Sequence, residues 1–518
     1  MNTKHIGAVL CASLFFSSLS AQPGTLDATF GDGGKVFAPI GTQNDLAHAA
    51  VLQPDGRIIV AGWAKMGATH DFALARFTAD GAPDLTFGTA GKLTTDIGGA
   101  DDQAIAVALQ PDGRIMAAGW TFNGADLDFA LVRYLPDGTA DSSFGIAGKQ
   151  TTELGASDYI ASVAIQPDGK IVVAGHTNTL GTLDFVLARY LPDGTLDGDF
   201  GTNGIVITDF FQNSDWGASV ALQSDGKIVV AGLAVTGADY DFALARYHTD
   251  GSPDDSFGMA GKVTTAIGPS DDKGIAVLVQ PDGKILVGGH LHNGAHFDFA
   301  LARYDTDGSL DEHFGHAGKT VTDFEGDGDL IAALALQPDG KILAAGRSSN
   351  GQHYDFALAR YQSNGLLDNT FGDAGRVVTP MSAGLNSAFS ALVQPGGNIV
   401  LAGYAHDGTA EDFALARYVS GLSVSVEDVS SAIVGASVFP NPVQGNTATL
   451  KYTLQTPAAV SIRLFDMRGQ LVRAFTTGMP ESAGTHQRTL LLSADLPPGM
   501  YQIAITTANG SATVGMVR

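Results

Sequence analysis

Seven histidines of this 518-residue chain fall in one zone of a repeated unit, in or near the segment that follows an Ala-Gly or Gly-Gly pair. Aromatic, basic and histidine side chains around a shallow acidic surface suit stacking on sugar rings or recognition of a protein. We therefore predict a ligand-binding set: Trp63, Trp120, His176, His290, His292, His296, Arg347, His353, Tyr404 and His406. The alternative is that these residues only cover the ends of the units. His290, His292 and His296 could also hold a transition metal.

Two sets of aspartates recur beside this zone. Six stand eight residues before a repeated Gln, with Asn386 in the seventh copy: Asp45, Asp102, Asp158, Asp215, Asp272 and Asp329. Seven more open a later apolar segment: Asp71, Asp128, Asp184, Asp241, Asp298, Asp355 and Asp412. Both sets should gather on one face. They either cap turns by accepting backbone N–H bonds, or form a metal site for a hard cation such as Ca²⁺, for which the first set supplies the predicted ligands.

Two further sets, one of arginines and one of aspartates, predict buried ion pairs. The arginines lie on the face of an apolar segment: Arg76, Arg133, Arg189, Arg246, Arg303, Arg360 and Arg417. The matching aspartates precede each Phe-Gly: Asp27, Asp84, Asp141, Asp197, Asp254, Asp311 and Asp368. A buried arginine without a partner would be expensive, and a carboxylate matches the guanidinium fork. We expect both sets to be structural.

The elements that must position these residues repeat every 56 or 57 residues. The string QPDG opens at Gln53, Gln110, Gln166, Gln280 and Gln337, with QSDG at Gln223 and QPGG at Gln394. Each unit reads as four short strands, with a Pro-Asp-Gly turn between the first two. Four antiparallel strands joined by short turns form one propeller blade, and units of this length bury their faces against their neighbours.

The two ends of the array decide between a propeller and a solenoid. Residues Thr25 to Ala38 match only the last quarter of a unit, and the seventh unit lacks that quarter. We therefore predict a closed seven-bladed β-propeller over residues 22–419, in which the N-terminal strand completes the last sheet. The repeat, through DFALARY, QPDGKI and the DGxxDxxFG pattern, resembles the delta-60 repeat family of bacterial proteins. That resemblance implies no activity.

The N-terminus predicts export. Residues 1–21 contain Lys4, the apolar run IGAVLCASLFF and the small residues SSLSA, which is typical of a signal peptide. No later segment approaches the roughly 20 apolar residues that a spanning helix needs. The single cysteine, Cys11, lies inside this segment, so the mature chain has no disulfide.

The composition changes after the array. A linker rich in Ser and Val covers residues 420–436, and residues 437–518 hold short β-branched segments that predict a small β-sandwich. The motifs VFPNP, LFDMRGQLV, GTH and LPPGMY occur there in order, and this domain resembles the type A C-terminal sorting domain of type IX secretion cargo in Bacteroidetes. The resemblance implies contact with the type IX machinery and delivery to the outer cell surface or the medium. An ordinary adhesive sandwich is the alternative.

The net charge of −25 disfavours nucleic acid and anionic membranes as partners. The sequence has no Gly-x-Ser-x-Gly elbow, no His-Glu-x-x-His, no P-loop and no dinucleotide fingerprint, and we predict no catalytic residue. We expect an all-β protein that acts as an exported binding or adhesion module for a glycan or a surface protein. The alternatives are a polysaccharide-acting enzyme with its site in the histidine-bearing loops, and a structural surface or matrix protein.

Overall fold

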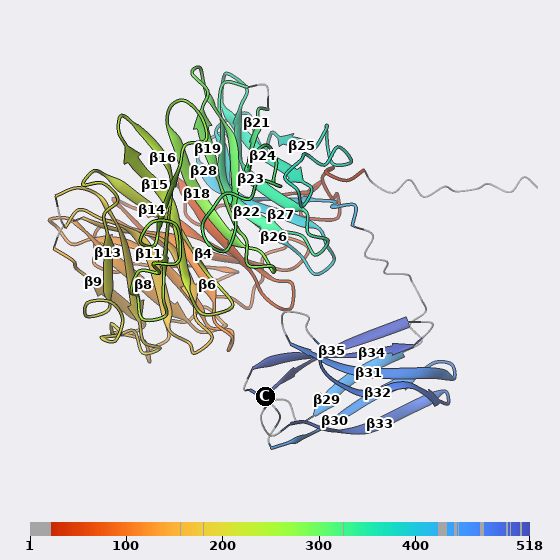
Figure 1. Ribbon diagram of the computed structural model, residues 1–518. Coiled ribbons are helices and arrows are strands. Elements are labelled where there is room, and N and C mark those ends of the chain that lie inside the picture. The colour runs from red at the N-terminus through yellow and green to blue at the C-terminus, as the bar shows by residue number, and fades with distance from the viewer. Residues whose placement is uncertain are drawn as a thin grey trace, which may run out of the picture. The chain divides into compact units, whose positions relative to one another are not determined.

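The computed structural model describes residues 22–155, 157–179, 181–324, 326–422, 433–439, 443, 445–466, 471–493, 496–497, 499–507 and 510–518. The predicted signal peptide and most of the predicted linker lie outside these residues. The chain divides into two compact units, with the boundary between Leu422 and Ser423. All regular elements of the described residues are β-strands, so the predicted all-β class is confirmed (Figure 1).

The first unit contains seven four-stranded antiparallel sheets. Six of them are each formed by four strands that follow one another in the chain. The first three sheets are β2 (Asp45–Leu52), β3 (Ile58–Met66), β4 (Thr69–Phe77) and β5 (Lys92–Thr95); β6 (Asp102–Leu109), β7 (Ile115–Phe122), β8 (Leu127–Tyr134) and β9 (Lys149–Thr152); and β10 (Asp158–Ile165), β11 (Ile171–Thr177), β12 (Asp184–Tyr190) and β13 (Ile205–Thr208). The next three are β14 (Asp215–Leu222), β15 (Ile228–Thr236), β16 (Asp239–Tyr247) and β17 (Lys262–Thr265); β18 (Asp272–Val279), β19 (Ile285–His292), β20 (Phe297–Tyr304) and β21 (Lys319–Thr322); and β22 (Asp329–Leu336), β23 (Ile342–Ser349), β24 (Tyr354–Tyr361) and β25 (Arg376–Thr379). The seventh joins β1 (Lys35–Ala38) to β26 (Asn386–Val393), β27 (Ile399–His406) and β28 (Glu411–Tyr418).

A Pro-Asp-Gly turn joins the first and second strands of five of the six consecutive sets, and Ser224-Asp225-Gly226 takes its place between β14 and β15. In the first copy the Gln53 N–H donates to the Arg57 carbonyl at 2.8 Å, and the Gly56 N–H donates to the Gln53 carbonyl at 2.9 Å. Gly56 has φ +86°, a value that residues with a Cβ rarely adopt. In the first set, β3 is mostly apolar and buried, and β4 is buried from Asp71 to Phe77.

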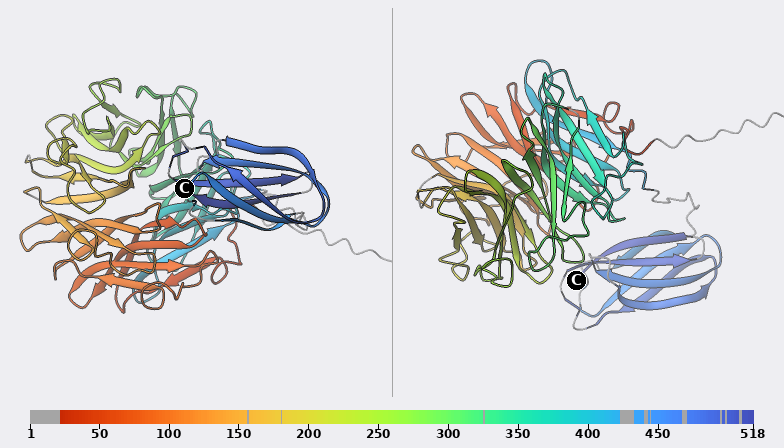
Figure 2. Two further views of the ribbon diagram at one scale, coloured as in Figure 1. Left: turned by 90° about the horizontal axis from the view of Figure 1, so that it is seen from below. Right: turned by 45° about the horizontal axis from the view of Figure 1, so that its top comes forward.

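The sheet that contains both ends of the array has the order β1-β28-β27-β26. Its β1 runs antiparallel to β28, with Lys35 opposite Ala416 and Ala38 opposite Phe413. Side chains of β3, including Ile58 and Val60, share a buried cluster with Val400 and Leu415 of this sheet. In both views of Figure 2 the red N-terminal strands lie beside the cyan strands that precede residue 422.

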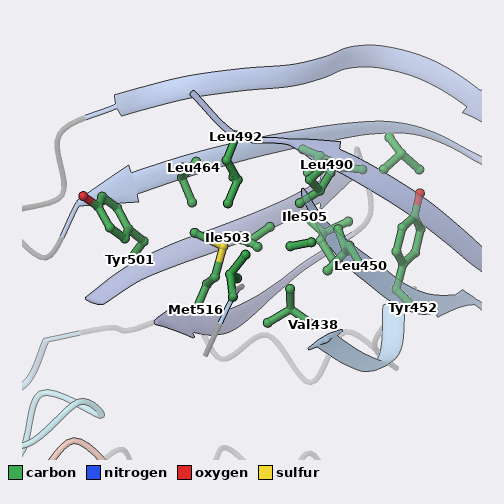
Figure 3. Close-up of a cluster of buried hydrophobic side chains, with 14 of the residues drawn as sticks. Val438, Leu450, Tyr452, Leu464, Leu490, Leu492, Tyr501, Ile503, Ile505 and Met516 are labelled. Carbon is green, nitrogen blue, oxygen red and sulfur yellow. The ribbon is translucent and has the colours of Figure 1, made fainter. Parts of the chain in front are cut away.

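The second unit consists of two sheets with the orders β29-β30-β33 and β32-β31-β34-β35. The strands are β29 (Ile433–Phe439), β30 (Thr447–Leu454), β31 (Ala458–Asp466), β32 (Leu471–Glu481), β33 (Gly484–Leu491), β34 (Met500–Thr507) and β35 (Gly510–Val517). Leu450 and Leu490 of the first sheet and Leu464, Ile503 and Ile505 of the second share one core (Figure 3). Within the part of the chain that the structure describes, we find no helix that could span a membrane.

Candidate functional site

The first strands of all seven sheets of the array line one cavity of about 480 Å³. A β-bulge interrupts the pairing of these strands with their neighbours, for example between Ala47 and Ala49 in β2 and between Ala388 and Ser390 in β26. The extra residues, His48 and Phe389, are among the cavity-lining residues. Each bulge therefore places one extra residue of the first strand at the cavity.

The glycine before each variable position is explained by the same bulge. A Cβ on Gly62 would lie 1.9 Å from the Leu46 carbonyl oxygen, and a Cβ on Gly175 would lie 1.7 Å from the Tyr159 carbonyl oxygen. Only glycine fits under the displaced first strand. The Ala-Gly pair thus belongs to the scaffold, and the residue after it is free to vary.

Aromatic rings from successive sheets form a line at one edge of the array. The His176 ring stacks on Tyr159 with centroids 4.8 Å apart and on Trp216 with centroids 5.6 Å apart. Trp120 extends the line at 6.3 Å from Tyr159, and Tyr240 extends it at 6.4 Å from Trp216. Trp216 is 38% exposed, which is high for a tryptophan. We call these five residues the aromatic line.

A second aromatic group surrounds His48 at the cavity. The Trp63 indole Nε1 donates to His48 Nε2 at 3.2 Å, and the Trp63 ring meets the His70 ring edge to face at 4.4 Å. His48 lies 5.1 Å from the Phe389 ring, which stacks on Tyr404 at 5.8 Å. Burial lowers the pKa of His48 to about 4, so this histidine is neutral at neutral pH.

The basic side chains at this edge lie next to rings as well. Arg347 sits over the Tyr354 ring at 4.7 Å and donates to Ser387 Oγ at 3.2 Å. His290 is buried, and burial, followed by the nearby Lys273 and Arg347 charges, lowers its pKa to about 3. The Phe297 ring contacts His290.

The loop histidines make local contacts. His292 packs edge to face on Phe297 at 5.0 Å, and His296 Nδ1 lies 3.2 Å from Asp298 Oδ1. His353 Nε2 lies 3.7 Å from Asp355 Oδ1, and His406 Nδ1 accepts the Gly408 N–H at 3.0 Å. Among the described residues, no group of three ligand atoms includes a histidine. The transition-metal alternative for His290, His292 and His296 therefore gains no support.

Several residues of this edge were not predicted from the sequence: His48, Tyr159, Trp216, Tyr240, Phe297 and Phe389. Tyr159 and Trp216 each follow an aspartate of the first set directly, and they lie opposite His176 and Leu233 in the neighbouring strand. The usable signal was that the position after each of these aspartates varies between units as much as the position after Ala-Gly.

The arginine and aspartate sets pair inside every sheet. Their side-chain N–O distances run from 2.7 Å in Arg76–Asp84 to 3.0 Å in Arg417–Asp27. The other pairs are Arg133–Asp141, Arg189–Asp197, Arg246–Asp254, Arg303–Asp311 and Arg360–Asp368. Each guanidinium also covers a phenylalanine ring and donates to a backbone carbonyl of the following unit, as Arg417 does to the Ala79 oxygen at 2.7 Å. The pairs therefore join neighbouring sheets as well as satisfying a buried charge.

The first aspartate set caps turns. Each of its six members is fully buried and accepts a backbone N–H of the preceding turn through Oδ2, at distances of 2.6 Å for Asp45, Asp102, Asp215 and Asp272, 2.8 Å for Asp329 and 2.9 Å for Asp158. Burial raises the pKa of these carboxyls, to about 6 for Asp158 and to about 7 for Asp215.

The second set lies beside the first across each boundary between sheets. The side chains of Asp71, Asp184 and Asp298 approach Asp102, Asp215 and Asp329 of the following sheet, and each pair has a third aspartate nearby. The remaining members, Asp128, Asp241, Asp355 and Asp412, lie at equivalent positions of β8, β16, β24 and β28.

Family models match both units. A domain of unknown function, the DUF5122 β-propeller, matches six times, at residues 53–87, 110–144, 166–200, 223–257, 280–314 and 337–371. A secretion system C-terminal sorting domain matches residues 437–517. No curated protein matches the chain.

Solved structures are similar to this chain at low identity and with TM-scores below 0.5. PorZ, an essential bacterial surface component of the type-IX secretion system of Porphyromonas gingivalis, is 12% identical with a TM-score of 0.41, over 93% of this chain and 60% of PorZ. The chain thus spans less than two thirds of the length of PorZ. Sqt1 from Chaetomium thermophilum is 12% identical with a TM-score of 0.41, over 74% of this chain and 100% of Sqt1. A putative glycoside hydrolase from Bacteroides ovatus is 14% identical with a TM-score of 0.29, over 52% of this chain and 89% of that protein.

The sorting domain implies an interaction with the type IX secretion machinery and a location at the cell surface or in the medium. The chain is a DUF5122 β-propeller-repeat protein that carries a secretion system C-terminal sorting domain.

Proposed function

We propose that the propeller is a non-catalytic recognition module that binds a glycan through the aromatic line at the edge of the array. The observation that carries this proposal is the stack of Tyr159, His176 and Trp216, because it leaves a large indole 38% exposed beside two further rings. Exposed aromatic faces bind the apolar C–H faces of sugars, and neighbouring hydroxyls need polar side chains of the kind that surround this line.

The charges of the protein limit the class of glycan that can bind. The chain has 54 acidic residues against 29 basic ones, so a polyanionic glycan would be repelled. Burial lowers the pKa of His176 to about 4, so the middle of the stack is uncharged at neutral pH. A neutral glycan is therefore the favoured class.

The test is a glycan array probed with the full chain, once with CaCl₂ and once with a chelator. We expect selective binding of neutral glycans by the wild-type protein, and a loss of at least about tenfold in affinity for Trp216→Ala, since exposed aromatic anchors commonly dominate binding.

Leu85→Ala is the matched control, because Leu85 is an exposed apolar side chain, at 74%, that lies outside the aromatic line. It should bind like the wild type. Binding that Trp216→Ala leaves intact would place the ligand elsewhere. Silence of the wild-type protein on the array would contradict glycan recognition and direct the search to protein partners.

A further inference from the structure

At one boundary between sheets, three aspartates from different segments each bring a ligand oxygen to within 4.8 Å of the others: Asp184, Asp209 and Asp215. Asp184 begins β12, Asp209 follows β13, and Asp215 begins β14 of the next sheet. Asp184 and Asp215 are fully buried, whereas Asp209 is half-buried. The group therefore spans two sheets and has one side open to solvent.

Two of these carboxylates have unsatisfied oxygens. Asp215 Oδ2 accepts the Phe210 N–H at 2.6 Å, but Oδ1 of Asp215 and Oδ1 of Asp184 are buried and have no hydrogen-bond partner among the described residues. The Lys262 ammonium donates to the backbone oxygen of Asp209 at 2.5 Å. Buried carboxylate oxygens without a partner are costly, so the group needs a positive charge or a proton between its members.

The boundary before β26 shows what satisfies such a pair. Asn386 stands there in the position of Asp215, and its Nδ2 donates to Asp355 Oδ1, in the position of Asp184, at 2.9 Å. Pro380 takes the position of Asp209 at this boundary, so no third carboxylate is present. At this boundary the amide N–H of Asn386 thus links β26 to Asp355 of β24. With Asp215 in this position the bridge is missing and the negative charge is larger.

Two other boundaries carry groups of the same kind, Asp71–Asp96–Asp102 and Asp298–Asp323–Asp329. In the first, the Thr121 hydroxyl donates to Asp102 Oδ1. In the second, His296 Nδ1 lies 3.2 Å from Asp298 Oδ1. Oδ1 of Asp298 and Oδ1 of Asp329 are also buried without a hydrogen-bond partner among the described residues, as Oδ1 of Asp184 and Oδ1 of Asp215 are. The two groups differ in their neighbours, because the His296 ring lies beside Asp298, whereas the Thr182 hydroxyl donates to Asp184 Oδ2 at 3.4 Å.

We propose that Asp184, Asp209 and Asp215 bind one hard divalent cation, represented by Ca²⁺, that joins the two neighbouring sheets. The three side chains offer oxygen and neither nitrogen nor sulfur, which suits Ca²⁺ better than a transition metal. Water at the half-buried Asp209 side would complete the 6–8 ligands that Ca²⁺ takes. Because Trp216 follows Asp215 directly, the cation would also fix the strand end that carries the exposed ring. The proposal does not depend on glycan binding.

The test is calorimetric titration of CaCl₂ into the chelator-treated full chain, with a thermal melt in parallel. We expect binding with a Kd on the order of 10⁻³ M or tighter, typical of extracellular calcium modules, and a melting temperature that rises with Ca²⁺. Asp209→Ala should weaken the tightest binding at least about tenfold and remove that rise. The chain carries Ala266 at the equivalent position after β17, so this variant is expected to fold.

Asp239→Ala is the matched control, since Asp239 is an exposed aspartate on the adjacent hairpin and should leave binding unchanged. If Asp209→Ala fails to fold, Asp209→Asn removes the charge with little change of shape and tests the same point. The proposal is overturned if the wild type takes up no Ca²⁺ at millimolar concentrations, or if Asp209 variants bind as tightly as the wild type. It is also overturned if a protonated-carboxyl infrared band at neutral pH disappears in Asp215→Asn and no Ca²⁺ binds, because a shared proton then fills the gap.

Discussion

Replacement of Phe30 by alanine would measure how firmly the N-terminal segment holds the last sheet. Phe30 is fully buried, and the Arg417 guanidinium lies 4.8 Å from the centre of its ring. The two residues come from opposite ends of the repeat array in the sequence. Phe87 occupies the same position in the next sheet, fully buried and 4.7 Å from Arg76. Truncation of a buried phenylalanine costs about 3–5 kcal/mol, and the lost contact with a desolvated guanidinium contributes up to about 2 kcal/mol of that total.

The assay is urea unfolding of the full chain followed by tryptophan fluorescence, which reports on the propeller alone because Trp63, Trp120 and Trp216 all lie in the first unit. Phe87→Ala is the matched control, since its contacts are local in the chain. We expect both variants to lose about 3–5 kcal/mol of unfolding free energy. If Phe30→Ala loses less than about 1 kcal/mol while Phe87→Ala loses 3 or more, the N-terminal segment does not hold the last sheet in solution, and the argument for a ring completed by β1 fails.

Three further outcomes can be checked. Arg246→Met should destabilise the propeller by up to about 3–5 kcal/mol in urea unfolding, because it removes the buried partner of the Asp254 carboxylate and leaves the Lys227 ammonium at 3.0 Å as its remaining cation, and adding Asp254→Asn should recover part of the loss. Burial lowers the pKa of His176 from 6.5 to about 4 in the folded protein, so between these values the unfolded chain takes up a proton that the folded chain does not. Stability should therefore fall as the pH drops through that window, by up to about 1.4 kcal/mol per pH unit, and the fall should be smaller in His176→Phe. Deletion of residues 437–517 should abolish delivery of the protein to the cell surface or medium, measured by immunoblotting of cell fractions, whereas a deletion that spares the tail should not.

The repeat made the strands, turns and sheets predictable from the sequence. Much of the candidate site was not predictable, because it depends on which residues of neighbouring strands lie opposite one another. The Pro-Asp-Gly turns and the incomplete terminal units predicted four-stranded sheets and the pairing of β1 with β28, both of which are present. Tyr159 was missed because it becomes a neighbour of His176 only through cross-strand pairing. The bulge that places His48 at the cavity was also missed, since one extra residue in a strand leaves no mark in a pattern of small apolar residues. Aspartates at equivalent positions of the repeat differ in their hydrogen-bond partners from one sheet boundary to the next. This difference cannot be predicted from the sequence, because the residue type is the same at each boundary.

The pairing of the first strand with the last sheet sets the timing of assembly. Thr29 and Arg417, which share a hydrogen bond in the finished sheet, are 388 residues apart in the chain. A ribosome that adds 5–20 residues per second needs roughly 20–80 s to make the second partner after the first. Until then the opening strand is an unpaired edge, and the sheets already made have no last neighbour. The sorting domain begins at residue 437, 15 residues after Leu422, so the ribosome makes the signal for outer-membrane delivery directly after the residues that finish the last sheet. A chain whose synthesis stops before the sorting domain would thus lack the sorting signal. If synthesis stops before β28, the chain would also lack a complete last sheet.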